Sequence, residues 1–227
     1  MKFSLAKEHR DFFYTHQALE LEELISESQL SSLRSSIKEF FKKKLNISER
    51  GRQHIDPKQL YTIGHDLWRD EEIIKKIIFH RRFAEMALEL EYQAPFRIGF
   101  DQFIPSGLEA NKTYTLHDLN SFQGTLCGFL ICLKSHNSES EEQNQNEEFN
   151  PFSSTEGNVT FIAPDCILDF SKVPEEAEYL LVTYTQDKSV YAYNENDPHT
   201  NFLKKLGYGF GDRIKEETHP IVFRYRH

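Results

Sequence analysis

Hydrophobic residues in the first third of the chain recur every three or four positions, which is the spacing of one face of an α-helix. Over residues 28 to 45 this spacing predicts a helix with a buried face made of Leu30, Leu33, Ile37, Phe40, Phe41 and Leu45. Ser26 and Gln29 form a capping-box pattern, in which each side chain accepts a hydrogen bond from the other residue's backbone N–H group. We expect this helix to expose its lysines.

Two more helices are expected before residue 92. Asp56 followed by Pro57 is typical of an N-cap and a first helical position, because proline lacks the amide hydrogen that would be unpaired there. Asp70 is expected to cap a helix over 70 to 90, with a break near His80. Its apolar stripe consists of Ile73, Ile74, Ile77, Ile78, Phe83, Met86, Ala87 and Leu90.

From Phe96 onward the pattern changes to short blocks of β-branched and aromatic residues separated by Gly, Pro, Asn and Asp, which indicates strands and turns. The expected strands are 96–104, 112–117, 124–134, 158–164, 178–185, 189–194 and 220–225. Helices that precede a run of strands predict an α+β fold, in which the helices buttress a β-sandwich or jelly roll.

The stretch from 135 to 150 contains five glutamates, no lysine or arginine and almost no apolar side chain. Such a segment cannot bury enough surface to offset its ordering entropy. We therefore expect a mobile acidic loop from about 135 to 156, inserted between two strands.

Composition narrows the class of protein. With 227 residues, of which 38% are hydrophobic, the chain is long enough for one sizeable core, and we expect a single domain over 1–227. A net charge of -9 repels phosphate backbones, so nucleic-acid binding is not expected. No run of about 18 apolar residues and no signal peptide is found, so we expect a cytoplasmic protein without a membrane span. Cys127, Cys132 and Cys166 lack the paired spacing of a zinc site and are expected to be reduced, buried thiols.

The candidate chemistry centres on His117 and Asp118, in a polar turn between two strand blocks. A non-haem iron site takes two histidines and one carboxylate on one face of the metal. Residues two apart on a strand share a face, whereas neighbours point to opposite faces. His117 and Asp118 are adjacent, so a bulge or turn would be needed to bring both to one ion.

Two other pairings of histidine with an acid occur in the sequence. His54-Ile55-Asp56 has the spacing of two positions, but it lies in the helical third, where Asp56 is better explained as a cap. Asp197-Pro198-His199 has the reverse order in a turn-rich stretch, where a surface turn is the simpler interpretation.

The order of the blocks PFRIGFDQFI, TLHDLNSFQG, TLCGFLICLK and GNVTFIAPDCILDF, behind a helical first third, resembles the iron(II)/2-oxoglutarate oxygenases, in particular the phytanoyl-CoA dioxygenase branch. The resemblance implies a double-stranded β-helix, or jelly-roll, core over 93–227 with a helical buttress over 1–92. It implies that the first iron ligands fall near His117 and Asp118. The distal histidine would fall between 189 and 193, where Tyr191 stands instead, and tyrosine is a poor replacement for imidazole on iron(II).

Two hypotheses of function follow. The favoured one is an oxygenase-like protein with an incomplete metal triad, kept as a non-catalytic binding or regulatory module, for which no cofactor is expected. The alternative is an active oxygenase, in which His117, Asp118 and His199 hold iron(II), 2-oxoglutarate chelates it, and Arg224 or Lys204 pairs with the outer carboxylate.

The sequence names no partner and no substrate, although a barrel of this kind has room for a small-molecule ligand. The chain also resembles a small family of chlamydial proteins. That resemblance implies a bacterial, cytoplasmic setting and adds no mechanism.

Overall fold

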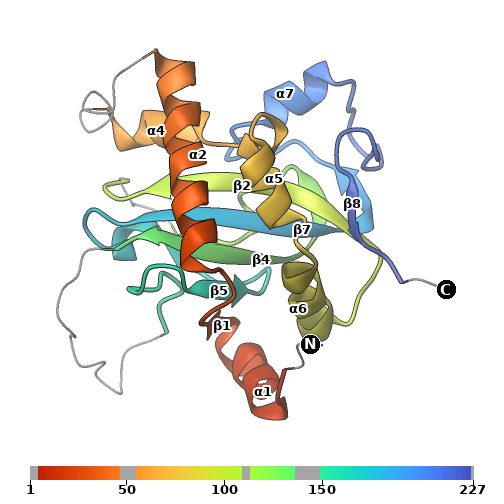
Figure 1. Cartoon of the computed structure of the whole chain (residues 1–227). Helices are drawn as coiled ribbons and strands as arrows, with labels where there is room; N and C mark the ends of the chain where they lie inside the picture. The colour runs from red at the N-terminus through yellow and green to blue at the C-terminus, as the bar shows by residue number, and fades with distance from the viewer. Residues whose placement is uncertain (1–4, 47–54, 109–112, 136–148, 226–227) are drawn as a thin grey trace.

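A curled antiparallel sheet forms the centre of the molecule, and α2 and α5 lie across one of its faces (Figure 1). The computed structural model describes residues 5–46, 55–108, 113–135 and 149–225. The six strands run in the order β1-β5-β4-β7-β2-β8. Their bounds are β1 Ala18–Leu21, β2 Phe96–Pro105, β4 Phe122–Lys134, β5 Val159–Ile162, β7 Glu178–Tyr191 and β8 Ile221–Phe223. A second, two-stranded sheet pairs β3 (Thr113–Tyr114) with β6 (Leu168–Asp169).

Most helices precede the main strands, as the sequence predicted. Their bounds are α1 Lys7–His16, α2 Glu27–Leu45, α4 Pro57–Ile63, η1 Leu67–Arg69, α5 Glu72–Ile78, α6 Arg81–Glu91, η2 Phe170–Lys172 and α7 Thr200–Lys205. The capping box of Ser26 and Gln29 is present at the start of α2, and Asp56 caps α4 ahead of Pro57. The α+β class is therefore confirmed.

The two faces of the sheet bury different clusters, because neighbouring side chains of a strand point in opposite directions. On β4, Phe129 faces the helices and stacks on Phe83 of α6, with ring centroids 4.7 Å apart. Leu130 belongs to the cluster on the other face, with Phe100 and Tyr179. Each large apolar side chain buried in this way contributes roughly 1.5–3 kcal/mol.

The helix predicted over 70 to 90 has the expected break near His80, so it forms two helices. α5 ends at Ile78, and His80 caps α6 by accepting a hydrogen bond from the backbone N–H of Arg82. The expected cap Asp70 is wrong, because the N-cap of α5 is Glu71. Ile73 was also assigned to the buried stripe, yet it is 40% exposed.

The two strands predicted at 178–185 and 189–194 form the single strand β7. Thr185 pairs with Thr125 and Val190 pairs with Gln123, so β7 carries extra residues opposite Gly124. This is a bulge, in which added residues bend a strand without ending it. Gln186 still pairs with Phe96 of β2, so the strand continues on that side through the start of the bulge.

Part of the expected acidic loop is packed. Residues 136–148 lie outside the described residues. After them, Phe152 and Ser153 are buried, and Phe152 packs edge-on against Tyr179. The C-terminal part of the predicted loop thus contributes to the core.

The three cysteines are free and buried, as expected. Burial raises the pKa of Cys132 to about 12 and that of Cys166 to about 11, so these thiols are poor nucleophiles. Within the described residues, no helix is long and apolar enough to cross a membrane.

Candidate functional site

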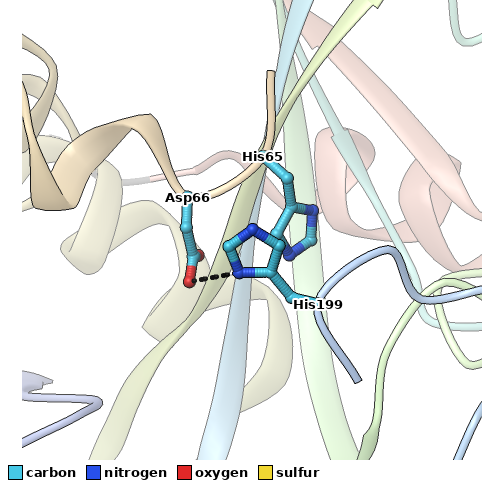
Figure 2. Close-up of side chains that lie close together, drawn as sticks. All are labelled: His65, Asp66 and His199. Carbon is cyan, nitrogen blue, oxygen red and sulfur yellow. Dashed lines mark ion pairs between the residues drawn. The ribbon is translucent and has the colours of Figure 1, made fainter. Parts of the chain in front are cut away.

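Three side chains of the kind that bind metals meet at one point: His65, Asp66 and His199 (Figure 2). One ring nitrogen of each histidine and one carboxylate oxygen all lie within 4.8 Å of one another. The two imidazole rings are in contact, with centroids 4.2 Å apart. Among the described residues, this is the group of histidine, cysteine and acid side chains with a spacing suited to an ion.

The segment with His65 and Asp66 is fixed against β2. The preceding helix α4 ends at Gly64, where an added Cβ would lie only 2.7 Å from the Cβ of Phe103. The backbone N–H of Phe103 donates to Gly64 O at 2.6 Å, and the backbone N–H of Asp66 donates to Asp101 O at 2.8 Å. Only glycine permits this close approach of two backbones.

The buried side chain of Asp101, whose pKa is raised by burial, holds the next turn in place. Asp101 accepts hydrogen bonds from the backbone N–H groups of Leu67 and Trp68, at 3.1 and 3.0 Å. These bonds satisfy the first two backbone N–H groups of η1, which have no partner within the helix. The candidate ligands therefore stand on a segment tied to the sheet on both sides.

The tautomer of His65 follows from its partner Gln102. The amide nitrogen of Gln102 faces the carbonyl oxygens of Tyr61, Gly64 and Phe103, so it must be the donor. Its Oε1 is then an acceptor, and it lies 2.8 Å from Nδ1 of His65. Nδ1 must carry a hydrogen. The other nitrogen, Nε2, is left with a free lone pair in the neutral ring, and burial lowers the pKa of His65, which favours that neutral form.

Asp66 is buried and ionised. Burial alone would raise the pKa of Asp66, but the adjoining His199 ring and the Arg69 guanidinium outweigh burial and hold that pKa well below its usual range. Arg69 Nε donates to Asp66 Oδ2 at 2.7 Å, and Trp68 Nε1 lies 3.3 Å from Oδ1. The carboxylate is therefore available as an anionic ligand.

His199 arrives from the far end of the chain, at the start of α7. Its Nδ1 is buried and lies 3.5 Å from Asp66 Oδ2, but the geometry is not that of a hydrogen bond. The backbone N–H of His199 donates to Oδ1 of Asp197 at 2.8 Å. The same Asp197 oxygen lies 3.7 Å from Nε2 of His65. Asp197 itself is buried, and its Oδ2 accepts a hydrogen bond from the backbone N–H of Ser121.

The donor set fits a divalent transition metal. Two neutral imidazoles and one carboxylate are the ligands of non-haem iron centres and suit zinc as well. His65 Nε2 has a lone pair without a proton donor in front of it, and His199 Nδ1 is a buried atom without a hydrogen bond. Both atoms would gain a partner from a cation, and Gln102 supplies the outer hydrogen bond that metal-binding histidines usually make.

The structure places the sequence-predicted residues elsewhere. His117 is exposed, with Nε2 3.6 Å from Oδ1 of Asp165. Asp118 accepts hydrogen bonds from the backbone N–H and the hydroxyl of Thr115, as a turn-capping residue does. His199 is brought together with His65 and Asp66, not with His117 and Asp118.

The remaining predicted positions have other partners. Tyr191 is buried, and its hydroxyl lies 3.1 Å from Thr200 O. Lys204 lies over the ring of Tyr193, with Nζ 4.0 Å from the centroid. Arg224 is exposed. His54 lies outside the described residues.

Two sequence interpretations need correction. The prediction of a surface turn at Asp197-Pro198-His199 is wrong, because Asp197 is 4% exposed and His199 belongs to the candidate site. His65-Asp66 was not singled out. Its sequence signal is a histidine and an acid directly after the glycine that ends a helix, the same adjacency that drew notice to His117 and Asp118.

No family model matches the sequence, and no curated protein matches it. Several solved structures are similar to this chain in fold. The non-heme alpha ketoglutarate dependent carbocyclase SnoK from nogalamycin biosynthesis has a TM-score of 0.69 at 14% identity, covering 96% of this chain and 97% of SnoK. The corresponding epimerase SnoN has a TM-score of 0.65 at 11% identity, over 96% of this chain and 98% of SnoN. CT296 from Chlamydia trachomatis has a TM-score of 0.50 at 14% identity, over 82% of this chain and 97% of CT296.

At these identities the comparison shows a shared fold. The chain has the fold of the iron/2-oxoglutarate-dependent oxygenases, which confirms the resemblance inferred from the sequence, and a chlamydial protein is among its structural neighbours.

Proposed function

We propose that this protein is a non-catalytic metal-binding module, built on the double-stranded β-helix of the phytanoyl-CoA dioxygenase branch, in which His65, Asp66 and His199 hold one divalent transition-metal ion. The observation that carries the proposal is the position of the two ring nitrogens relative to buried carboxylate oxygens. Nε2 of His65 lies 3.7 Å from Oδ1 of Asp197, and Nδ1 of His199 lies 3.5 Å from Oδ2 of Asp66 and is buried without a hydrogen bond. A divalent cation satisfies both ring nitrogens at once.

The surroundings of the group support a binding role over catalysis. Turnover with 2-oxoglutarate needs a cation for the outer carboxylate of that molecule. Lys204 lies instead on the Tyr193 ring, and Arg224 is exposed. Arg69 is close to the group, but it is engaged with Asp66 and with the carbonyl oxygen of Thr218. A bacterial cytoplasmic setting is part of this proposal, on the strength of the chlamydial resemblance.

An active oxygenase is the second candidate. It is favoured by the donor set, since two histidines and one carboxylate match the non-haem iron centre, and by the structure of SnoN in complex with Fe³⁺, alpha ketoglutarate and nogalamycin RO. A bound iron(II) ion would supply the dioxygen chemistry. The chain's own residues would hold that ion, and Gln102 would keep His65 in the ligating tautomer.

The test is anaerobic titration calorimetry of chelator-stripped protein with iron(II), cobalt(II) and zinc(II). We expect binding of one ion per chain, lost in His65→Ala and in His199→Ala. His117→Ala, at an exposed histidine, is the matched control and should bind as the wild type does. Absence of binding by the wild type, or loss of binding in His117→Ala with retention in His65→Ala, would overturn the proposed site.

Catalysis is tested on the same samples. With iron(II), 2-oxoglutarate and oxygen, a non-catalytic module should form no more succinate than the metal-free protein. Succinate formation that depends on His65 and His199 would reject the module and establish the oxygenase.

A further inference from the structure

His199 reaches the candidate site on a segment of its own. His65 and Asp66 lie on one segment that is tied to β2, whereas His199 lies between β7 and α7 (Figure 2). Nδ1 of the His199 ring is buried without a hydrogen bond, so this nitrogen does not hold the ring in place. The position of the imidazole therefore depends on what fixes its backbone.

The side chain of Asp197 fixes that backbone. Its Oδ1 accepts a hydrogen bond at 2.8 Å from the backbone N–H of His199, two residues further on, which is the hydrogen bond of an Asx turn. Its Oδ2 accepts one at 3.1 Å from the backbone N–H of Ser121, directly before β4. Asp197 is buried, so water does not compete for these bonds. One carboxylate thus links the candidate ligand to the start of a central strand.

The turn before β4 holds the same segment at a second point. The amide nitrogen of Asn194 donates to the carbonyl oxygens of Asp118 and Asn120, at 2.7 and 3.0 Å. Asp118, a candidate iron ligand from the sequence, thus belongs to a turn that supports the segment carrying His199.

Asp197 is well placed to orient His199 and poorly placed to bind the ion itself. Both of its oxygens already accept a backbone N–H group, and the group of three candidate ligands does not include it. Its Oδ1 lies 3.7 Å from Nε2 of His65, beyond hydrogen-bond range. Residues that orient a metal ligand from outside the coordination sphere are common, and losing one typically weakens metal binding 10- to 100-fold.

We propose that Asp197 is the positioning residue of the metal site. It does not bind the ion. Its carboxylate ties the turn at 197–199 to Ser121 and so holds the His199 ring against the His65 ring. The inference deepens the proposed function and rests on it only for the effect on metal affinity, because the placement of His199 is a property of the metal-free chain.

The first measurement needs no metal. The rings of His65 and His199 are in contact, so chelator-stripped protein with labelled histidines should show nuclear Overhauser effects between their ring protons. We expect these to be lost in Asp197→Ala, which removes both hydrogen bonds, and to weaken in Asp197→Asn, which keeps one acceptor oxygen. Asp212→Ala, at an exposed carboxylate that accepts the backbone N–H of Gly209, is the matched control and should keep them.

The second measurement is the affinity for zinc(II), by titration calorimetry. We expect it to fall about 10- to 100-fold in Asp197→Ala and by less in Asp197→Asn, with no change in Asp212→Ala. The visible bands of bound cobalt(II) should keep their wild-type positions in Asp197→Asn, because no ligand is lost.

The outcomes separate this inference from the proposed function. Overhauser effects that are absent from the wild type, or retained in a folded Asp197→Ala, would overturn the positioning role, as would wild-type zinc(II) affinity in that variant. Shifted cobalt(II) bands in Asp197→Asn would make Asp197 a ligand and overturn it too. Absence of metal binding by the wild type would reject the proposed function, and the Overhauser effects would still decide the role of Asp197. If circular dichroism shows that Asp197→Ala does not fold, the same measurements on Asp197→Asn decide.

Discussion

Nδ1 of His65 lies 2.8 Å from Oε1 of Gln102, and both side chains are buried. His65 and Gln102 also form an isolated antiparallel β-bridge, so backbone and side chain both fix the imidazole. Because Gln102 sets the tautomer that leaves a lone pair on Nε2, it would influence metal binding at the proposed site without touching the ion.

The first prediction concerns this glutamine. Gln102→Ala should weaken zinc(II) or cobalt(II) binding by about 10- to 100-fold, the usual effect of losing an outer hydrogen bond to a ligating histidine. Titration calorimetry measures the change. Gln123→Ala, at an exposed glutamine of β4, should bind as the wild type does. Equal affinities for the two variants would show that Gln102 does not orient His65.

The second prediction compares two isoleucines of α5. Ile77 is 6% exposed and Ile73 is 40% exposed, although both were assigned to one apolar stripe. Ile77→Asp should lower the free energy of unfolding by about 4 kcal/mol or more, since it removes apolar burial and leaves a carboxylate in the core. Ile73→Asp should cost about 1 kcal/mol or less. Urea unfolding measures both, and similar losses for the two would contradict the orientation of α5.

Elements whose stability depends on residues close in sequence were predictable, whereas elements that depend on distant residues were not. α2 was predictable because its capping box and apolar stripe are local, and both are present. The single strand β7 was not, because its continuity depends on pairing with β2 and β4, which only the folded chain reveals.

The candidate site could be predicted only in part, for the same reason. His199 was named from the sequence, but its neighbours were not, because His65 and Asp66 lie far from it along the chain. Asp66 also has a left-handed backbone, with φ at 55°, and no sequence pattern announces that conformation. Adjacency of a histidine and an acid occurs at both 65–66 and 117–118, and only the fold decides which pair meets His199.

The third prediction concerns pH and Glu91, at the end of α6. Burial raises the pKa of Glu91 to about 7 from an ordinary value of 4.5. The unfolded chain therefore loses this proton at lower pH than the folded protein does, and stability falls as pH rises from about 4.5 to about 7. Glu91→Gln cannot ionise. It should be more stable than the wild type at pH 8 by on the order of 2 kcal/mol, after allowance for solvent screening, and close to it at pH 4.5.

Urea unfolding at several pH values measures that difference. The matched control is Glu72→Gln, at a carboxylate whose side chain is 77% exposed. A stability difference between Glu91→Gln and the wild type that stays constant from pH 4.5 to 8 would contradict the burial of this carboxyl group.

The last prediction concerns Arg69, which holds the site together when no ion is bound. It donates to Asp66 and to the carbonyl oxygen of Thr218, and its guanidinium lies 4.4 Å from the ring centroid of Trp68. Arg69→Met removes the charge that offsets buried Asp66. Allowing for the partial exposure of Arg69, the metal-free protein should lose about 2 to 3 kcal/mol, or roughly 4 to 12 °C in melting temperature.

A bound ion should reverse much of this loss. With Arg69 absent, a divalent cation is the charge left to offset Asp66, so saturating zinc(II) should raise the melting temperature of Arg69→Met by more than it raises that of the wild type. The matched control is Arg81→Met, which breaks an exposed pair with Glu85 and should change stability by about 1 kcal/mol or less, with the wild-type response to zinc(II). A zinc(II) response in Arg69→Met no larger than in the wild type would mean that the ion and Arg69 do not act on the same carboxylate, and Asp66 would no longer be a tenable ligand.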